Sequence, residues 1–427
     1  MTYPRLRSLI SGIRLRITSI TFAVLLGVLA TQSAPAQTYT VLHAFQGVPD
    51  GALPVAGLVL DVKGSLYGTT ESAGDSSCQH PYGCGVVFKI DTTGTETVLF
   101  RFGHGRGDVP QAGLVRDPAG NLYGTTSGGG HFLAGTVFRL GKDGKQKVLH
   151  SFDRQNGSPG GSFPGARVLR DSTGNLFGTT VNGGNSSDSG VVFKLNKFGK
   201  ETVLYAFTCP ICYGKAGGGF GVSDSGVIRD AAGNLYGIAA GGTVTNGCTY
   251  GCGVVYKVDK NHAGTVFYSF TGGSSDGAGP NGNLTKDAAG NLYGTTYGGG
   301  GNGCNNNGCG TVFKVDPSGH ETLLYRFTGT TDGTAAAGGV ARDPQGNLYG
   351  TTSRGGDPTC DGGFGCGVVF KIDPNGNETT LHTFTGGTDG ESPNPDLIRD
   401  AAGNLYGTTF LGGDPTCHCG VVFKITP

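Results

Sequence analysis

The sequence predicts an all-β fold made of seven similar four-stranded units arranged in a ring, and three observations lead to this prediction. The segment Gly-Asn-Leu-Tyr-Gly-Thr-Thr at 120–126 occurs seven times along the chain with small changes in sequence. The aspartates that precede the seven copies, from Asp61 to Asp400, are 54 to 59 residues apart. Such a period is typical of propeller blades or solenoid coils. Each unit holds four candidate strands, and the last unit lacks one that a stray N-terminal strand can supply. Together these features favour a seven-bladed β-propeller.

Residues 1–36 are predicted to be a secretion signal peptide, so that the propeller spans residues 37–427. Four arginines within residues 5–16 precede the apolar run 17–30, and the small residues 34–36 offer a cleavage site. A retained membrane anchor is the alternative, but the apolar run is shorter than the ~20 residues of a spanning helix. We therefore expect a secreted protein, extracellular or periplasmic, with no membrane span once the signal is removed.

The second copy illustrates the four strands of one unit. Residues 112–117 form a short apolar run, Gly120 allows a tight hairpin, and 121–126 form the second strand. Residues 135–140 alternate apolar and polar side chains, and 148–152 supply the fourth strand. We call the strands of each unit a, b, c and d in chain order.

The ends of the chain favour a closed ring over an open stack. The chain ends at Pro427, directly after a strand c at 421–424, so the seventh unit has no strand d of its own. Residues 40–45, directly after the predicted signal, have the pattern of a strand d without a unit. An open solenoid would be expected to carry polar caps instead. We therefore expect the N-terminal strand to complete the C-terminal blade.

The charge balance argues against a nucleic-acid partner. The signal removes four arginines and no acid, which leaves 27 of the 31 basic residues against 31 acidic ones. A mildly acidic chain without a basic run gains little from binding a polyanion. We expect no nucleic acid partner.

Twelve cysteines fall into six close pairs, which behind a secretion signal predict local disulfides that stiffen loops. The pairs are Cys78 with Cys84, Cys209 with Cys212, Cys248 with Cys252, Cys304 with Cys309, Cys360 with Cys366, and Cys417 with Cys419. The last pair spans a single residue, His418, and a bridge of that kind is strained. A metal site or pairing with another loop is therefore the alternative there, although zinc would need a fourth ligand.

The two ends of the ring differ in sequence. The a–b and c–d turns, at the end we call the turn face, are short and nearly invariant. The b–c loops and d–a crossovers, at the end we call the loop face, hold the cysteine pairs and the glycine runs. Variable loops on a rigid scaffold are where binding usually occurs. Aromatic residues in these loops are candidate glycan-binding residues, with packing over the blades as the alternative: Tyr82, Phe132, Tyr213, Phe220, Tyr250, Tyr297 and Phe364.

A second candidate site is a partial ring of six cations near the central channel. Each cation precedes the turn aspartate at the end of strand a, and Leu60 breaks the set. Such a ring could hold an anionic ligand; alternatively, each cation pairs with an aspartate or a backbone carbonyl at the end of its own blade. The six are Arg116, Arg170, Arg229, Lys286, Arg342 and Arg399.

The sequence predicts no cofactor and no metal site, with weak calcium binding in Asp- and Asn-rich loops such as 185–188 and 357–361 as the one alternative. No catalytic constellation stands out from the repeat. Residues that break the pattern would mark a catalytic site, and the largest break, from 209 to 225 together with 238–240, resembles loop variation.

With these repeats in view, the chain resembles the GloVer tandem-repeat family, a group of secreted bacterial proteins described as choice-of-anchor. The resemblance covers about residues 38–427 and rests on L-Y-R-F-T-G-T-T-D-G at 324–333, D-P-Q-G-N-L-Y-G-T-T-S-R-G-G at 343–356 and G-C-G-V-V-F-K at 365–371. It implies export and surface display, and it brings no catalytic residues. Because the chain ends at Pro427 without a sorting or anchoring tail, covalent or membrane attachment is not expected.

We therefore expect a monomeric, non-catalytic scaffold that binds an extracellular glycan or protein through the loop face. The alternatives are an extracellular propeller hydrolase, lactonase or lyase with a metal at the channel mouth, and a purely structural surface protein. Carboxylates or histidines that break the repeat and converge at the channel would favour an enzyme. An exposed aromatic cluster would favour glycan binding.

Overall fold

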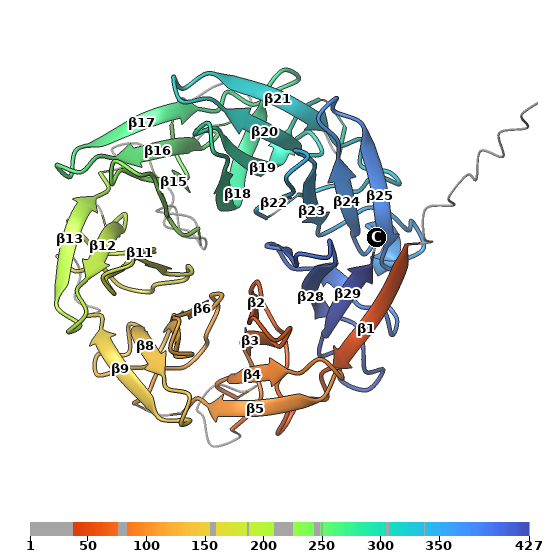
Figure 1. The fold of residues 1–427 in the computed structure, drawn as a ribbon. Coiled ribbons are helices and arrows are strands. Elements are labelled where there is room, and N and C mark those ends of the chain that lie inside the picture. Colours follow the sequence, from red (N-terminus) through yellow and green to blue (C-terminus); the bar gives the residue numbers. More distant parts are fainter. Residues whose placement is uncertain are drawn as a thin grey trace, which may run out of the picture. The chain divides into compact units, whose positions relative to one another are not determined.

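Seven antiparallel sheets follow one another along the chain and surround a central opening (Figure 1). The structure is a computed structural model that describes residues 37–75, 83–103, 105–153, 159–185, 188–208, 225–242, 248, 251–301, 303–304, 307–336 and 338–426. The predicted seven-bladed β-propeller is confirmed. Within these residues the helical content is a single 3-10 turn, η1 (Asp361–Gly363).

Each blade contains four strands, numbered here in chain order. Blade 1 holds β2 (Val59–Leu60), β3 (Leu66–Thr70), β4 (Val86–Ile90) and β5 (Glu96–Arg101). Blade 2 holds β6 (Val115–Arg116), β7 (Leu122–Thr126), β8 (Thr136–Leu140) and β9 (Gln146–Ser151). Blade 3 holds β10 (Leu169–Arg170), β11 (Leu176–Thr180), β12 (Val191–Leu195) and β13 (Glu201–Ala206). Blade 4 holds β14 (Ile228–Arg229), β15 (Leu235–Ala239), β16 (Val254–Val258) and β17 (Gly264–Ser269).

The remaining blades follow the same order. Blade 5 holds β18 (Gly277–Lys286), β19 (Leu292–Gly299), β20 (Thr311–Val315) and β21 (Glu321–Arg326). Blade 6 holds β22 (Ala341–Arg342), β23 (Leu348–Thr352), β24 (Val368–Ile372) and β25 (Glu378–Thr383). Blade 7 holds β27 (Ile398–Arg399), β28 (Leu405–Leu411), β29 (Val421–Thr426) and β1 (Thr38–Ala44). A further short strand, β26 (Glu391–Pro393), pairs antiparallel with the end of β28.

The ring closes as the sequence predicted. β1 pairs antiparallel with β29, with Thr38 opposite Thr426 and Ala44 opposite Val421. In Figure 1 the red N-terminal strand accordingly lies beside the blue C-terminal one. Blade 7 is therefore assembled from both ends of the described chain.

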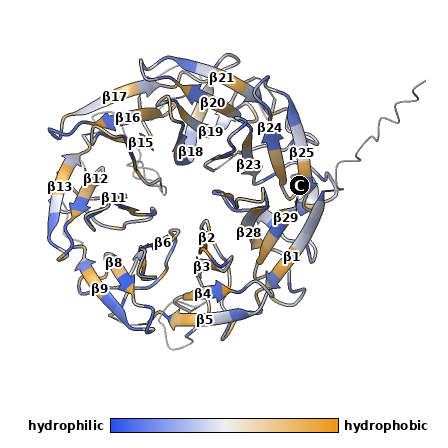
Figure 2. Cartoon of the chain, viewed as in Figure 1, coloured by the Kyte–Doolittle hydropathy of each residue, from blue (hydrophilic) through white to orange (hydrophobic). Residues whose placement is uncertain are grey.

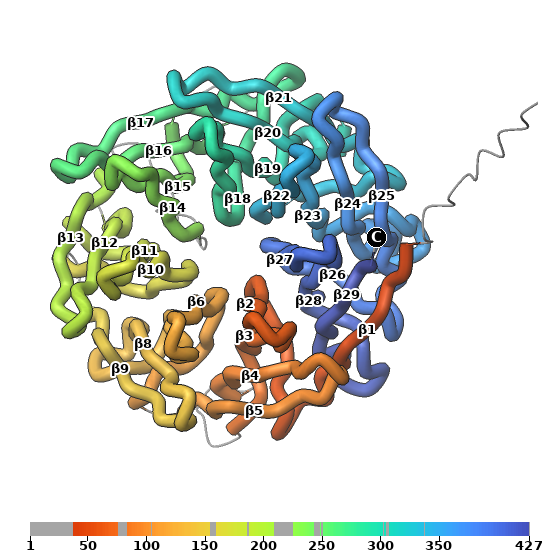
Figure 3. Tube along the Cα trace, in the orientation of Figure 1, coloured from red at the N-terminus to blue at the C-terminus, as the bar shows by residue number. Residues whose placement is uncertain are grey.

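The innermost strands are shorter than the sequence predicted in every blade except blade 5, where β18 has ten residues. The expected strand a at 112–117 is reduced to Val115 and Arg116, which lie opposite Tyr123 and Leu122. Ahead of Val115 the backbone serves the neighbouring blade instead, because the Ala112 carbonyl accepts a hydrogen bond from Thr69 at 3.1 Å. Figure 3 shows these short strands nearest the centre of the ring. The inner segments thus connect blades rather than extend sheets.

The blades pack on one another through aromatic pairs. Phe102, at the end of blade 1, contacts Phe138 of blade 2 edge to face, with ring centroids 5.1 Å apart. The equivalent pair occurs at all seven blade interfaces. Edge-to-face contact is a favourable aromatic geometry. Figure 2 shows hydrophobic and hydrophilic segments along the strands around the ring.

The repeated threonines also join blades. Thr125 in β7 donates its hydroxyl to the Ala166 carbonyl of blade 3 at 3.1 Å. The same bond reaches across the closing interface, from Thr408 to the Ala56 carbonyl at 3.4 Å. Blade 4 carries Ile238 at this position, and isoleucine has no hydroxyl group with which to make this hydrogen bond. The repeated motif is therefore mainly a set of structural contacts.

A glycine in every strand b makes room for an aromatic ring of strand c. A Cβ atom built on Gly124 would lie 2.8 Å from Cζ of Phe138 and 3.0 Å from Cδ2 of Leu114. Phe138 is fully buried and lies directly opposite Gly124 in the sheet. The repeated glycine is therefore required by space.

Gly124→Ala should destabilise the fold by roughly 1–3 kcal/mol, because an added methyl group overpacks the core. Urea unfolding would measure this loss. The matched control is Gly387→Ala, since Gly387 is exposed and a Cβ atom there would come no closer than 3.6 Å to another heavy atom. Equal stability of both variants and the parent would contradict the steric explanation.

The predicted signal peptide, residues 1–36, lies outside the described residues. No helix in the described part of the chain has the length and hydropathy of a membrane-spanning segment.

Candidate functional site

Three of the seven aromatic residues proposed for glycan binding are described, and all three are exposed. Phe132 is 46 %, Tyr297 50 % and Phe364 61 % exposed to solvent. Each lies between strands b and c or at the end of strand b, and therefore on the loop face. The other four lie outside the described residues: Tyr82, Tyr213, Phe220 and Tyr250. The three described rings come from different blades and form no single cluster.

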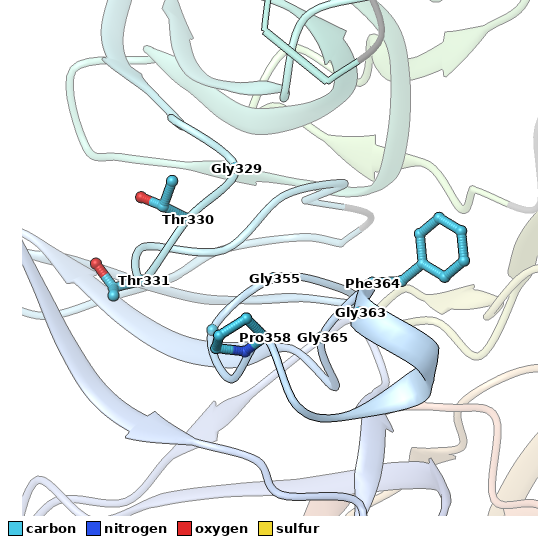
Figure 4. A pocket seen from close by; sticks show the side chains of 9 residues that line it. Gly329, Thr330, Thr331, Gly355, Pro358, Gly363, Phe364 and Gly365 are labelled. Carbon is cyan, nitrogen blue, oxygen red and sulfur yellow. The ribbon is translucent and has the colours of Figure 1, made fainter.

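A cavity of about 270 Å³ lies beside Phe364 on the loop face. Gly329, Thr330 and Thr331, from the crossover into blade 6, form one side. The b–c loop of blade 6, with Pro358 and Phe364, forms the other. Figure 4 shows Phe364 standing apart from the two threonine side chains. Glycines supply the remaining lining, so backbone groups are accessible to a ligand.

A cation lies over the ring of Phe364. The guanidinium of Arg354 lies 5.4 Å from its centroid, within the range of a cation–π interaction. The disulfide between Cys360 and Cys366 closes the same loop. Phe364 is therefore an exposed ring on a stiffened loop.

The six predicted channel cations lie against the preceding blade. The guanidinium of Arg170 is 5.6 Å from the ring centroid of Tyr123, and it also donates to the carbonyl of its own Asp171 at 3.4 Å. Three other arginines stack in the same way, Arg116 on Tyr67, Arg229 on Phe177 and Arg342 on Tyr293. These contacts join adjacent blades.

The remaining two cations, Lys286 and Arg399, also interact with residues of the preceding blade. Lys286 donates to the carbonyl of Arg229 at 3.2 Å. Burial would raise the pKa of Asp343, but its hydrogen bonds and the charge of Arg399 lower that pKa instead. Leu60, which breaks the set, leaves the interface between blades 7 and 1 without an equivalent cation. The sequence analysis sought partners only within the same blade, because the inter-blade contact becomes visible only in the folded ring.

The turn aspartates are structural acceptors. Asp117 accepts hydrogen bonds from the backbone and side chain of Asn121 at 2.9 and 2.8 Å and from the Tyr123 hydroxyl at 3.1 Å. Burial alone would raise the pKa of Asp117, but these bonds and the charge of Arg170 lower it. The aspartate therefore stays ionised as the anchor of the a–b turn.

One position of the repeat, at the centre of the ring, differs in residue type among the blades. In each blade it lies four residues before the turn aspartate, toward the loop face. We call the set of seven residues the axial collar. Four blades carry glycine there and three carry polar residues. The collar consists of Gly57, Gly113, Arg167, Gly226, Asn283, Gly339 and Asp396.

The members of the axial collar contact one another around the ring. A Cβ atom built on Gly57 would lie 2.7 Å from Cβ of Asp396. One on Gly226 would lie 2.6 Å from the Arg167 carbonyl oxygen. The contacts continue from Gly113 to Gly57 and Arg167, and from Gly339 to Asn283 and Asp396. The collar is therefore closed, and four of its members must be small.

A cavity of about 290 Å³ is centred on the axial collar. Arg167, Asn283 and Asp396 line it, and so do the amide side chains of Gln111 and Asn281. All five side chains are partly exposed. The cavity thus combines one cation, one carboxylate and three amides.

Sequence reasoning missed this site. Pattern breaks were expected in long loops, whereas these occur singly: Arg167 and Asp396 lie two residues before β10 and β27, and Asn283 lies within β18. Aligning the seven units would have revealed the series Gly, Gly, Arg, Gly, Asn, Gly, Asp. Only closure of the ring shows that the three polar residues face one cavity.

The cysteines that are described follow the predicted pairing. Disulfides join Cys248 to Cys252, Cys304 to Cys309, Cys360 to Cys366 and Cys417 to Cys419. Cys84 is also disulfide-bonded, while Cys78, Cys209 and Cys212 lie outside the described residues. Cys417 and Cys419 are thus bonded to each other. The described residues contain no group of three or more His, Cys, Asp or Glu side chains placed to hold a metal.

The fold and its cavities define a seven-bladed β-propeller with a polar cavity at the channel mouth. The model of the Gloeobacter/Verrucomicrobia repeat matches residues 23–162, 82–305 and 169–423. The chain therefore belongs to this family, as the sequence predicted. A comparison with curated proteins found no match.

Solved structures show the same fold at low sequence identity. The chain is similar to the extracellular domain of BT4673 from B. thetaiotaomicron, named in one structure as a one-component system and in another as a hybrid two-component system. Both comparisons give a TM-score of 0.52 and cover 90 % of this chain, at 11 and 12 % identity. The chain spans about two fifths of those domains, 40 and 39 %. A structure named as a gluconolactonase gives a TM-score of 0.41 at 12 % identity, covering 92 % of this chain and 93 % of its own.

Proposed function

We propose that this protein is an exported, non-catalytic binding protein that holds an extracellular polysaccharide on its loop face. The observation that carries the proposal is the contrast between the two faces. The turn face repeats one aspartate hairpin, and its cavity of about 270 Å³ between blades 1 and 2 is lined by residues of the repeated turns such as Tyr67, Arg116 and Gly120. The loop face holds the two cavities described above, the exposed aromatic rings and the polar members of the axial collar. Residues that vary on a rigid scaffold are where binding usually occurs.

The chemistry of the loop face suits carbohydrate. Sugar rings present hydroxyl groups and apolar faces, so they are bound by polar side chains and backbone groups together with aromatic rings. Thr330 and Thr331 supply hydroxyls on one side of the cavity, and the exposed ring of Phe364 belongs to the loop on its other side. The axial collar supplies amides and charges on the same face. A protein ligand is the alternative occupant.

Export is part of the proposal. The disulfides in the described b–c loops suit an oxidising compartment. They agree with the secretion signal expected in residues 1–36. We therefore place the protein outside the cytoplasm, in the periplasm or beyond the cell.

A polysaccharide array probed with the exported protein tests the proposal. Selective retention on a subset of glycans is the expected result. The array is probed with calcium and again with a chelator, and loss of retention on chelation would add a calcium ion to the site. Absence of retention on every polysaccharide would contradict the proposal.

Phe364→Ala should weaken retention on the selected glycan roughly two- to tenfold, the value of one aromatic contact. Phe198→Ala is a matched control, because Phe198 is 82 % exposed, lies in a c–d turn on the turn face and has Lys197 5.1 Å from its ring centroid. Titration calorimetry with an oligosaccharide of that glycan measures both affinities. Equal affinities for the two variants would remove Phe364 from the binding face.

A further inference from the structure

Arg167 is the cation of the axial collar, and among the described residues no side chain pairs with its charge. Its guanidinium lines the cavity and is partly exposed. Within the described residues no hydrogen bond or ion pair reaches it, in contrast to the stacked arginines of the turn face. A guanidinium offers a planar pair of donors that matches a carboxylate. Arg167 is therefore available to an anionic ligand.

Asp396 and Asn283 form an ordered pair elsewhere in the same cavity. The side-chain oxygen of Asn283 accepts from the Gly226 amide at 2.8 Å, and its NH₂ group donates to a carboxylate oxygen of Asp396. This orientation fixes the Asn283 amide and leaves the Asp396 carboxylate with further acceptor capacity. Asp396 also has φ 68, in the left-handed region that non-glycine residues seldom adopt. Its backbone is held there by the surrounding contacts.

The two charges select among anions. A phosphate or sulfate would meet Arg167 but would also bring more than one charged oxygen toward Asp396, and like charges repel. A sugar acid carries a single carboxylate for Arg167 and hydroxyls that can donate to Asp396. Its other hydroxyls can bond to the amides of Gln111 and Asn281. The cavity volume of about 290 Å³ is at the small end of ligand pockets.

We infer that the axial collar is a subsite for one uronic acid residue of a polysaccharide. Arg167 binds the carboxylate, and Asp396 and the neighbouring amides bind the ring hydroxyls. This inference rests on the proposed function, because it names the sugar class that the loop face selects. It concerns specificity rather than the presence of binding.

The test compares trigalacturonate with galactotriose of the same linkage, by titration calorimetry on the exported protein. We expect the acidic sugar to bind about tenfold or more tightly than the neutral one, since hydrogen bonds to charged groups are the stronger ones. Arg167→Gln should remove this preference, because it should weaken the binding of trigalacturonate about tenfold more than that of galactotriose. Arg167→Lys, which keeps the charge without the paired donors, should retain part of it. Arg106→Gln, at an exposed crossover arginine on the same face, is the control and should change nothing.

The outcomes separate the inference from the proposed function. Equal binding of the two sugars, or a preference that survives Arg167→Gln, overturns the inference while the loop-face function stands. If no carbohydrate binds in either experiment, the proposed function fails and the inference fails with it. Thermal unfolding of each variant confirms that the comparison is made on folded protein.

Discussion

Phe45→Ala should destabilise the propeller by roughly 3–5 kcal/mol, as expected for truncating a fully buried phenylalanine. Phe45 is 0 % exposed and follows the closing strand β1. Its ring meets Phe88 of blade 1 edge to face at 5.1 Å, and its amide donates to the Gly420 carbonyl at 3.0 Å. The residue thus joins the N-terminal strand to both the last and the first blade. Urea unfolding measures the loss.

Phe384→Ala is the matched comparison. Phe384 is equally buried, directly follows strand d of blade 6 and meets Phe423 with ring centroids 5.4 Å apart. Both variants lose a similar side chain. Only Phe45 follows a strand, β1, that no loop links to the rest of its own blade, because β1 comes from the opposite end of the chain. Hydrogen exchange of the β29 amides should therefore quicken more in Phe45→Ala than in Phe384→Ala. Identical exchange in the two variants would show that β1 does not close the ring.

The repeat made most of this architecture predictable. Strand count, strand order and ring closure follow from residues that occur in every unit, and the structure explains those residues one by one. Gly124 admits Phe138, Thr125 reaches the next blade, and Asp117 anchors the turn. Strand a was predicted too long because an apolar run does not show whether its backbone pairs within a sheet. Residues 112–114 instead face the neighbouring blade and the axis.

The candidate site was harder to predict for a physical reason. A single substitution such as Arg167 within a repeat looks like ordinary variation. Its place in a site is recognised only when ring closure brings Asn283 and Asp396, more than a hundred residues away in the sequence, to the same cavity as Arg167. The cation ring posed the opposite problem, since Arg170 and its equivalents are conspicuous in sequence but bind the preceding blade. Repetition indicates structural roles, and departures from it point to the site.

The stability of the protein should fall as the pH rises from about 4.5 to above 7. Glu96, Glu201 and Glu321 occupy the same place at the start of strand d, and burial raises the pKa of each to about 7 from the ordinary value of 4.5. The nearby charges of Asp50 and Asp276 add to the effect at Glu96 and Glu321. A raised pKa favours the folded state while the acid is protonated, and this contribution is lost as it ionises. The turn aspartates act in the opposite sense. Their lowered pKa values stabilise the folded state at pH values above the ordinary aspartate pKa, and this stabilisation is lost as the pH falls and the aspartates become protonated.

Glu321→Gln isolates one of these acids. One carboxylate oxygen of Glu321 is buried without a hydrogen-bond partner among the described residues, so ionisation there is costly. Glutamine cannot ionise, and the variant should therefore exceed the parent in stability at pH 8 by roughly 1–2 kcal/mol, allowing for partial exposure, and match it at pH 5. Asp143→Asn is the control, since that side chain is 59 % exposed and should leave both values unchanged. Urea unfolding at the two pH values provides the measurement, and a Glu321→Gln curve parallel to that of the parent would show that the buried acid does not set the pH dependence.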